Sequence, residues 1–87
     1  MKRKQFRTFL KSKQLTEKGI TSRVGWAIDI EQKFNLDLDK VCKSSEKTTN
    51  ILNDIKKSTL LKKRQKSNYE IGLLSYYEFL KSKQTPF

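Results

Sequence analysis

The sequence predicts an all-α protein, a compact bundle of four helices, and three observations lead to that prediction. Apolar residues recur at intervals of three and four along most of the chain, which is the spacing of one helix face. No segment shows the alternation of apolar and polar residues that a half-buried strand requires. The 87 residues, with nine aromatic side chains, suffice for one small core. We therefore expect a single domain over residues 1–87, with an ordered core at about 5–83.

The first predicted helix spans residues 2–13, because Phe6, Phe9 and Leu10 stand at positions i, i+3 and i+4. A break follows, and the hydroxyl of Thr16 can cap a second helix, which then starts with an acid that suits the helix dipole. The second helix has a broad apolar stripe. It comprises Ile20, Val24, Ala27, Ile28 and Phe34, widened by Trp26 and Ile30.

Gly25 inside the second helix either indicates a close approach by another helix or by a ligand backbone, or is simply a tolerated glycine. Asn35 is expected to end this helix, and Asp37 to cap a short single turn. Ser44 or Ser45 can then begin the third helix. Its narrow apolar face consists of Ile51, Leu52 and Ile55.

The last helix has the clearest start signal, because residues 67–70 read Ser-Asn-Tyr-Glu and match the capping box S-x-x-E. Residues 59–66 lack strong periodicity and predict a basic loop that Leu60 and Leu61 can anchor. Pro86 is expected to end the helix. The core predicted from the four helices is Phe6, Phe9, Leu10, Ile20, Val24, Ile28, Leu38, Ile51, Ile55, Leu73, Tyr77 and Leu80, and Trp26 is expected to pack beside it.

Charge is strong and unevenly distributed. Twenty Lys and Arg against nine Asp and Glu give a net charge of +11. Residues 1–23 carry +7, residues 24–55 carry −2 and residues 56–87 carry +6. Two basic ends around a mildly acidic centre indicate a surface for a polyanion, although solvated surface lysines are the simpler explanation. If the bundle brings the two ends together, the charge forms one face; if it holds them apart, the case for nucleic acid weakens.

Several classes of protein are excluded. The chain has no histidine, so it has no Ser–His or Cys–His nucleophile pair and no His-based metal site. A single cysteine, Cys42, forms no internal disulfide, and we expect it to be a small buried apolar side chain in a cytoplasmic protein without an export signal. No membrane-spanning stretch, metal or cofactor is expected. The carboxylates Asp29, Glu31, Asp37 and Asp39 are explained by capping and solvation, so no enzyme is predicted.

Three segments together resemble the SAM-like N-terminal core-binding domain of phage integrases and tyrosine recombinases, which is also fused to other DNA-processing enzymes. The first segment is Phe6-x-x-Phe9-Leu10. The second contains Ser22-Arg23-Val24, then Ile28-x-Ile30-Glu31, then Leu36-Asp37-Leu38-Asp39. The third is Leu73-Leu74-x-x-Tyr77-x-Phe79-Leu80. The resemblance covers roughly residues 6–80 through short motifs at core positions, and Asn35 stands where the family often has glycine. It implies a non-catalytic module that holds double-stranded DNA, with any catalysis on a separate domain. Tyr69, Tyr76 and Tyr77 are accordingly packing residues rather than nucleophiles.

The candidate nucleic-acid contacts come from two sources. The resemblance implies the start of the second helix, with Lys18, Ser22 and Arg23, and the entrance of the last helix, with Arg64, Lys66, Ser67 and Asn68. Composition adds Lys2, Arg3, Lys4, Arg7, Lys11, Lys62 and Lys63. Lys and Arg neutralise phosphates, and helix N-termini offer amide groups to anionic oxygens.

Two alternatives stay open. A protein-interaction or dimerisation module would use Trp26 and the end with Phe79 and Phe87, while its basic surface keeps it soluble. An RNA-binding protein would share the charge, although no sheet with exposed aromatic residues is predicted. The sequence leaves open the DNA sequence preference, DNA against RNA, the oligomeric state and whether a catalytic domain adjoins this one.

Overall fold

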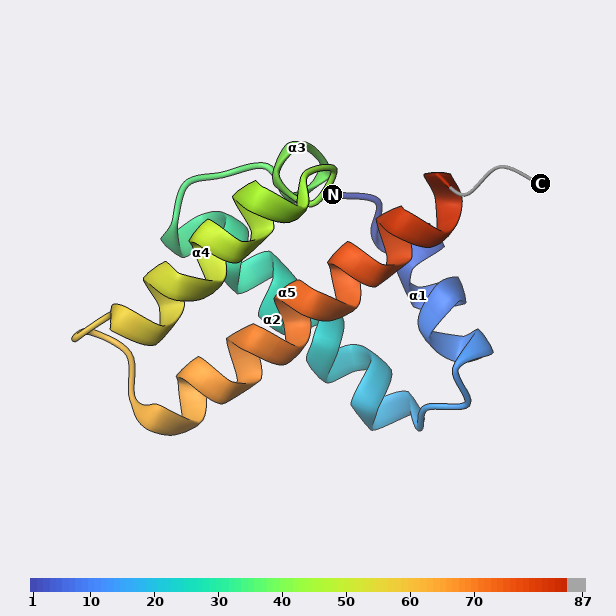
Figure 1. Ribbon diagram of the computed structural model, residues 1–87. Coiled ribbons are helices and arrows are strands. Elements are labelled where there is room, and N and C mark those ends of the chain that lie inside the picture. Colours follow the sequence, from blue (N-terminus) through green and yellow to red (C-terminus); the bar gives the residue numbers. More distant parts are fainter. Residues whose placement is uncertain (85–87) are drawn as a thin grey trace.

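A computed structural model describes residues 1–84, with the backbone alone for the last two of these. The helices are α1 (Arg3–Ser12), α2 (Glu17–Lys33), α3 (Leu38–Val41), α4 (Ser45–Lys57) and α5 (Lys63–Gln84). In Figure 1, α5 crosses α2 near the middle of both helices, α1 lies beside the C-terminal half of α5, and α4 lies along its N-terminal half. The Cα atoms extend over 40 × 28 × 16 Å, so the molecule is elongated and flat.

The predicted all-α class is confirmed, but residues 1–84 form five helices rather than four. The additional one is the single turn that Asp37 was expected to cap, which counts as helix α3. Asn35, two residues after the end of α2 at Lys33, takes the left-handed conformation with φ of 49°. The helix therefore ends close to the predicted residue. Pro86 and Phe87, for which we predicted a helix stop and an apolar contact, lie outside the described residues.

Three helix starts follow the capping rules predicted from the sequence. The side chains of Thr16, Asp37 and Ser44 accept hydrogen bonds from the backbone amides of Gly19, Asp39 and Lys47, at 3.1, 2.9 and 3.2 Å. Each of these helices also has an acid in its first turn, namely Glu17 in α2, Asp39 in α3 and Glu46 in α4. An oxygen cap and an acid both satisfy the positive end of a helix.

The predicted start of the last helix is wrong, because α5 begins at Lys63 and not at the capping box of residues 67–70. The amide of Lys62 donates to Oε1 of Gln65 at 3.1 Å, and the amide of Lys66 donates to the Lys62 carbonyl at 3.0 Å. These bonds start the helix one turn early, so the predicted basic loop is reduced to residues 58–62. Buried Leu61 anchors the loop, as expected, while Leu60 does not.

The observed core shares eight of the twelve predicted side chains and contains further ones. Eight predicted side chains are buried: Phe6, Leu10, Ile20, Val24, Leu38, Ile55, Leu73 and Leu80. Phe9, Ile28, Ile51 and Tyr77 are only half-buried and pack against the others, as does Trp26. Cys42, Tyr69 and Tyr76 are buried, in line with the buried thiol and the packing tyrosines that were expected. The core also contains Ala27 and Ile30 of the predicted second-helix stripe, the loop anchor Leu61, and Phe79. On α5, Tyr76 lies in the core where Tyr77 was predicted.

The two long helices touch at Gly72 and not at Gly25, where a close approach was one of the two interpretations. A Cβ atom at Gly72 would lie 2.8 Å from Cβ of Trp26 and 3.2 Å from the Ala27 nitrogen, so only glycine fits at the crossing. A Cβ atom at Gly25 would meet nothing within 4 Å. No neighbouring atom therefore requires glycine at position 25.

Aromatic rings fasten α1 to the C-terminal half of α5, and we call this cluster of Phe6, Phe9, Tyr76 and Phe79 the aromatic end. The rings of Phe6 and Tyr76 meet edge to face, with centroids 4.9 Å apart. Phe79 stacks at an angle against Phe6 and Phe9, at 5.5 Å from each. Such pairs add about 0.5–1.5 kcal/mol each beyond the apolar area they bury.

Beside the aromatic end, Tyr76 joins the start of the chain to α3. Its hydroxyl accepts a hydrogen bond from the amide of Lys2 at 2.9 Å and donates one to the carboxylate of Asp39. The Met1 ammonium lies 3.3 Å from Asp39 and 3.7 Å from Glu31. Burial raises the pKa of Asp39, but the Tyr76 hydrogen bond and the nearby ammonium outweigh it and hold the pKa below its usual value.

Candidate nucleic-acid interface

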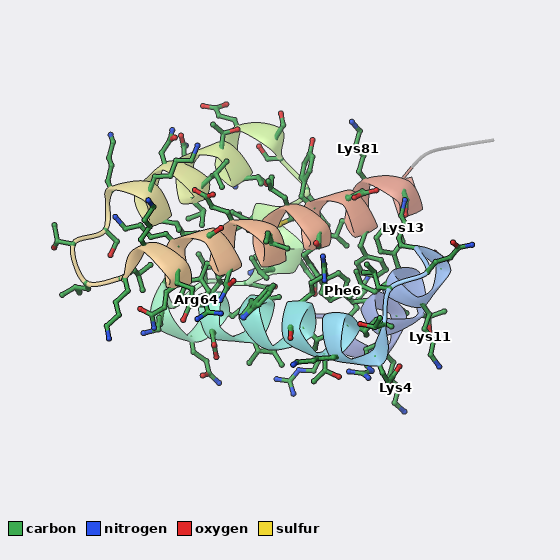
Figure 2. All side chains as sticks on the ribbon, turned by 90° about the horizontal axis from the view of Figure 1, so that it is seen from below. Lys4, Phe6, Lys11, Lys13, Arg64 and Lys81 are labelled. Carbon is green, nitrogen blue, oxygen red and sulfur yellow. The ribbon has the colours of Figure 1, made fainter. Side chains whose placement is uncertain are left out.

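Ten of the fourteen predicted nucleic-acid contacts fall into two separate groups of basic residues, to which the structure adds Lys56 and Lys57. The N-terminal basic surface consists of Lys2, Arg3, Lys4, Arg7 and Lys11 of α1 and its leading residue, with Lys18 of α2. The basic tip consists of Lys56, Lys57, Lys62, Lys63, Arg64 and Lys66, where α4 passes into α5. In Figure 2, Lys4 and Lys11 lie at one end of the molecule and Arg64 lies toward the other.

On the N-terminal basic surface, Lys4, Arg7 and Lys11 follow one another at helical spacing. The guanidinium of Arg7 lies 3.0 Å from the carboxylate of Glu17, which brings the start of α2 and exposed Lys18 beside α1. Lys4 and Lys11 extend to the same side of the molecule (Figure 2). Lys13 points elsewhere, and its ammonium lies 2.9 Å from Glu78 of α5, so this lysine belongs to no basic surface.

At the basic tip, hydrogen bonds hold the cations together against their mutual repulsion. The Lys66 ammonium donates to the Lys56 carbonyl at 3.0 Å and so ties the first turn of α5 to the last turn of α4. Lys33, at the end of α2, joins them across a hollow of 160 Å³ that Phe34, Ser58, Leu60 and Leu61 also line. Lys33 was not among the predicted contacts, since only the tertiary fold brings the end of α2 to this loop.

The structure holds the two basic surfaces apart, which is the arrangement that weakens the case for nucleic acid. The aromatic rings that seat α1 belong to Tyr76 and Phe79, which follow Arg64 by 12 and 15 residues. At 1.5 Å per residue, the surfaces are separated by about 20 Å along α5. They therefore do not form one continuous face, and a ligand that contacts both must be longer than this distance.

The helices that carry the basic surfaces start differently from the others. α1 follows Lys2 with no side-chain cap and has no acid in its first turn. α5 follows Lys62 and also lacks an acid in its first turn, and a lysine side chain contains no acceptor that could cap an amide. Both helices instead begin with cations, Arg3 and Lys4 in α1 and Lys63 and Arg64 in α5. At α5 the positive helix end and the side chains reinforce each other electrostatically, whereas at α1 the Asp39 and Glu31 carboxylates beside Met1 offset part of this charge.

Four of the predicted contacts do not lie in these surfaces as expected. The guanidinium of half-buried Arg23 donates to the Gly19 carbonyl of its own helix at 3.1 Å, and Ser22 is also half-buried. Ser67 and Asn68 occupy the second turn of α5, so their amides bond within the helix and are not offered at its start. The capping-box pattern misplaced these two residues.

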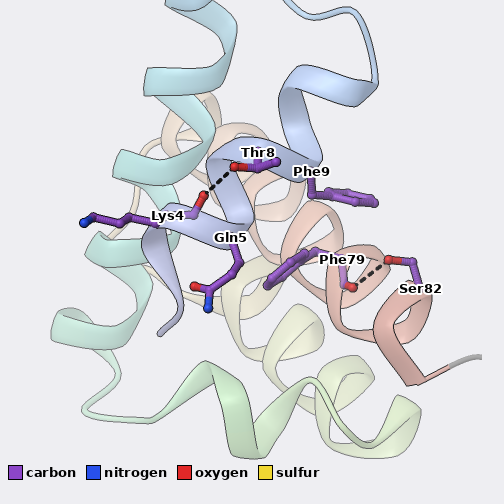
Figure 3. A pocket seen from close by; sticks show the side chains of 6 residues that line it. All are labelled: Lys4, Gln5, Thr8, Phe9, Phe79 and Ser82. Atoms are coloured by element: carbon purple, nitrogen blue, oxygen red, sulfur yellow. Dashed lines mark hydrogen bonds between the residues drawn. The ribbon is translucent and has the colours of Figure 1, made fainter.

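A shallow groove of 510 Å³ runs between α1 and the end of α5 (Figure 3). Phe9 and Phe79 give it apolar walls, while Lys4, Gln5, Thr8 and Ser82 line its edges. The polar groups here are already occupied in part, since the hydroxyls of Thr8 and Ser82 donate to the carbonyls of Lys4 and Phe79. The groove contains no pair of groups suited to proton transfer or nucleophilic attack.

The remaining reactive groups serve the fold. Burial raises the pKa of the Cys42 thiol to about 12, which keeps it protonated and unreactive. Burial likewise raises the pKa of Tyr76, and its hydrogen bond to Asp39 raises it further. Within residues 1–84, no three ligand-type side chains converge on a metal position. Over the same residues, none of the helices has the length and apolar character needed to cross a membrane.

Comparison with protein-family models, with curated proteins and with solved structures finds no match for this chain. The resemblance to core-binding domains therefore stays a prediction, and the function must be argued from the two basic surfaces.

Proposed function

We propose that this chain is a non-catalytic module that binds double-stranded DNA through its two basic surfaces. The observation that carries the proposal is the coincidence of charge and helix ends. The starts of α1 and α5 carry cations and no acids, whereas α2, α3 and α4 start with an oxygen cap and an acid. Clustered cations at helix N-termini are suited to phosphate groups.

The distance between the surfaces fits one duplex. Successive base pairs rise by about 3.4 Å, so a separation of about 20 Å corresponds to roughly six base pairs. The two surfaces would then contact phosphates at the two ends of this six-base-pair segment, and the central part of the bundle would lie over the base pairs between them. Lysine predominates at both sites, which favours backbone contacts that position the module over contacts that read bases.

A protein-interaction module is the second candidate. Of the residues first considered, Phe79 is buried, Trp26 is half-buried and Phe87 lies outside the described residues. Ile71 and Leu74 of α5 are instead exposed, at 39% and 46%. Two such side chains are ordinary on a small protein, which makes this candidate the weaker one.

The proposal is tested by fluorescence anisotropy with a labelled 16-base-pair duplex at several salt concentrations. Contacts to four to six phosphates predict a log–log slope of about −4 to −5 for affinity against salt. Three variants each remove three charges: Arg3, Lys4 and Lys11 to Gln; Lys62, Lys63 and Arg64 to Gln; and, as a matched control, the exposed Lys40, Lys43 and Lys47 to Gln.

We expect each of the first two variants to reduce the slope by about 2 to 3, and the control to change it by less than about 1. Equal losses in all three variants would indicate attraction by net charge alone and would refute a defined interface. No binding at low salt by folded protein would refute the function itself. Stronger binding to structured RNA than to duplex DNA would favour the RNA-binding alternative. Self-association detected by light scattering would favour the protein-interaction module.

A further inference from the structure

The basic tip carries a leucine that its surroundings do not explain. Leu60 has 92% of its surface exposed, the largest value among the exposed large apolar side chains. It lies between Lys56 and Lys57 on one side and Lys62 and Lys63 on the other, all of them exposed. A single exposed leucine is common on proteins, but this one lies among exposed lysines, at the hollow that it lines with Lys33, Phe34 and Leu61.

The backbone around Leu60 is fixed, so the side chain is presented rather than loosely exposed. Its amide donates to the Ser58 hydroxyl at 3.2 Å, and the amide of Ser58 donates to the Ile55 carbonyl at 3.3 Å. On the other side, Leu61 is buried and the Lys62 amide is held by Gln65. Because both neighbouring segments are held by hydrogen bonds or burial, the loop loses little conformational entropy when Leu60 enters a partner.

We propose that Leu60 is a wedge that enters the minor groove and partly separates two stacked base pairs while the lysines around it hold the flanking phosphates. Proteins that bend DNA use apolar side chains in this way, and the cations beside the wedge can hold the phosphates that flank the widened minor groove. This inference rests on the proposed function and adds to it that the preferred ligand is duplex DNA with an easily unstacked step, such as TA.

The test uses two 16-base-pair duplexes of the same length, one with a central TA step and one with an A-tract. Each carries 2-aminopurine at its centre, whose fluorescence rises on unstacking, and a donor–acceptor pair at its ends to measure bending. The variants are Leu60→Ala, Leu60→Met and, as a matched control, Leu74→Ala, which removes another exposed leucine outside the tip.

For the unaltered protein we expect a rise in 2-aminopurine fluorescence and closer duplex ends with the TA duplex, and weaker binding to the A-tract. Leu60→Ala should lose both signals and about tenfold in affinity for the TA duplex, with the salt slope unchanged, because the phosphate contacts remain. Leu60→Met and Leu74→Ala should behave as the parent protein does.

Salt-dependent binding without unstacking, or a Leu60→Ala variant that equals the parent protein, would overturn the wedge and leave the DNA-binding function intact. Absence of binding to either duplex would instead defeat the proposed function. A parallel measurement with vesicles of anionic phospholipid separates another partner: if Leu60→Ala weakens vesicle binding and leaves DNA binding unchanged, the leucine serves a membrane surface and the wedge is refuted.

Discussion

The aromatic end and the basic tip are built on the same helix, α5, yet they are held by different forces. At the aromatic end, buried rings from α1 and α5 interlock, and Tyr76 adds hydrogen bonds to the start of the chain and to α3. At the basic tip, Leu61 is the buried anchor and the other contacts are hydrogen bonds around exposed cations. The aromatic end therefore stabilises the fold. The exposed cations of the basic tip repel one another and do not.

The largest effect is expected at the aromatic end. Phe6 is 0% exposed and touches the rings of Tyr76 and Phe79. Phe6→Ala should lower the free energy of unfolding by about 3–5 kcal/mol, a large share of the stability of so small a domain. Urea denaturation followed by circular dichroism measures this, and a loss below about 1 kcal/mol would show that α1 is not an integral part of the core.

The crossing of α2 and α5, which joins the two regions, offers a matched pair of glycines. Gly72→Ala places a methyl group 2.8 Å from Trp26 and should cost about 1–3 kcal/mol by overpacking. Gly25→Ala meets nothing within 4 Å and should stabilise the protein by up to about 1 kcal/mol through helix propensity. Thermal denaturation of both variants gives the change in melting temperature, which should fall for Gly72→Ala and rise for Gly25→Ala. Changes of the same sign would show that the helices do not touch at Gly72.

Acid should weaken the aromatic end through Asp39. Since the folded state holds the pKa of Asp39 below its usual value, this carboxylate stabilises the fold above the unfolded pKa of about 3.9, and the contribution is lost as pH falls through the folded pKa. Asp39→Asn should cost about 1.5 kcal/mol at neutral pH and flatten the acid side of the stability profile. An unchanged profile would contradict the Tyr76–Asp39 link.

The smallest effect on stability is expected at the basic tip. Leu60→Ala removes a side chain that is 92% exposed and should change the free energy of unfolding by less than about 0.5 kcal/mol. Chemical denaturation beside Phe6→Ala makes the comparison direct. A loss above about 1 kcal/mol would mean that Leu60 packs on the core, and the side chain would then be unavailable to a ligand.

The sequence predicts most of the local structure because local rules decide it. Thr16, Asp37 and Ser44 cap their helices as their hydrogen-bonding chemistry requires. The prediction fails at the start of α5, which begins at Lys63 because Gln65 accepts from the Lys62 amide, a local signal one turn before the capping box that was chosen. The position of the close approach, Gly72, is missed because tertiary contacts decide it, and helix periodicity does not reveal which glycine faces another helix.

The candidate interface is predicted in part. Both basic surfaces follow from the charge of the two ends, but their separation is set by the length of α5 between Arg64 and Tyr76. Arg23 carries the right chemistry and turns to its own helix instead, and Lys33 joins the tip from a segment with no net basic charge. Charge patterns identify which segments attract a polyanion, whereas the fold decides which side chains reach it.

The central claim, that two separate helix starts hold one duplex, is tested most directly by titrating ¹⁵N-labelled protein with a 16-base-pair duplex and following the amide signals by NMR. The account predicts shifts confined to residues 2–11, 18 and 56–66, largest at the starts of α1 and α5, and reversed by salt. Shifts centred on residues 38–53, or none at low salt, would contradict it.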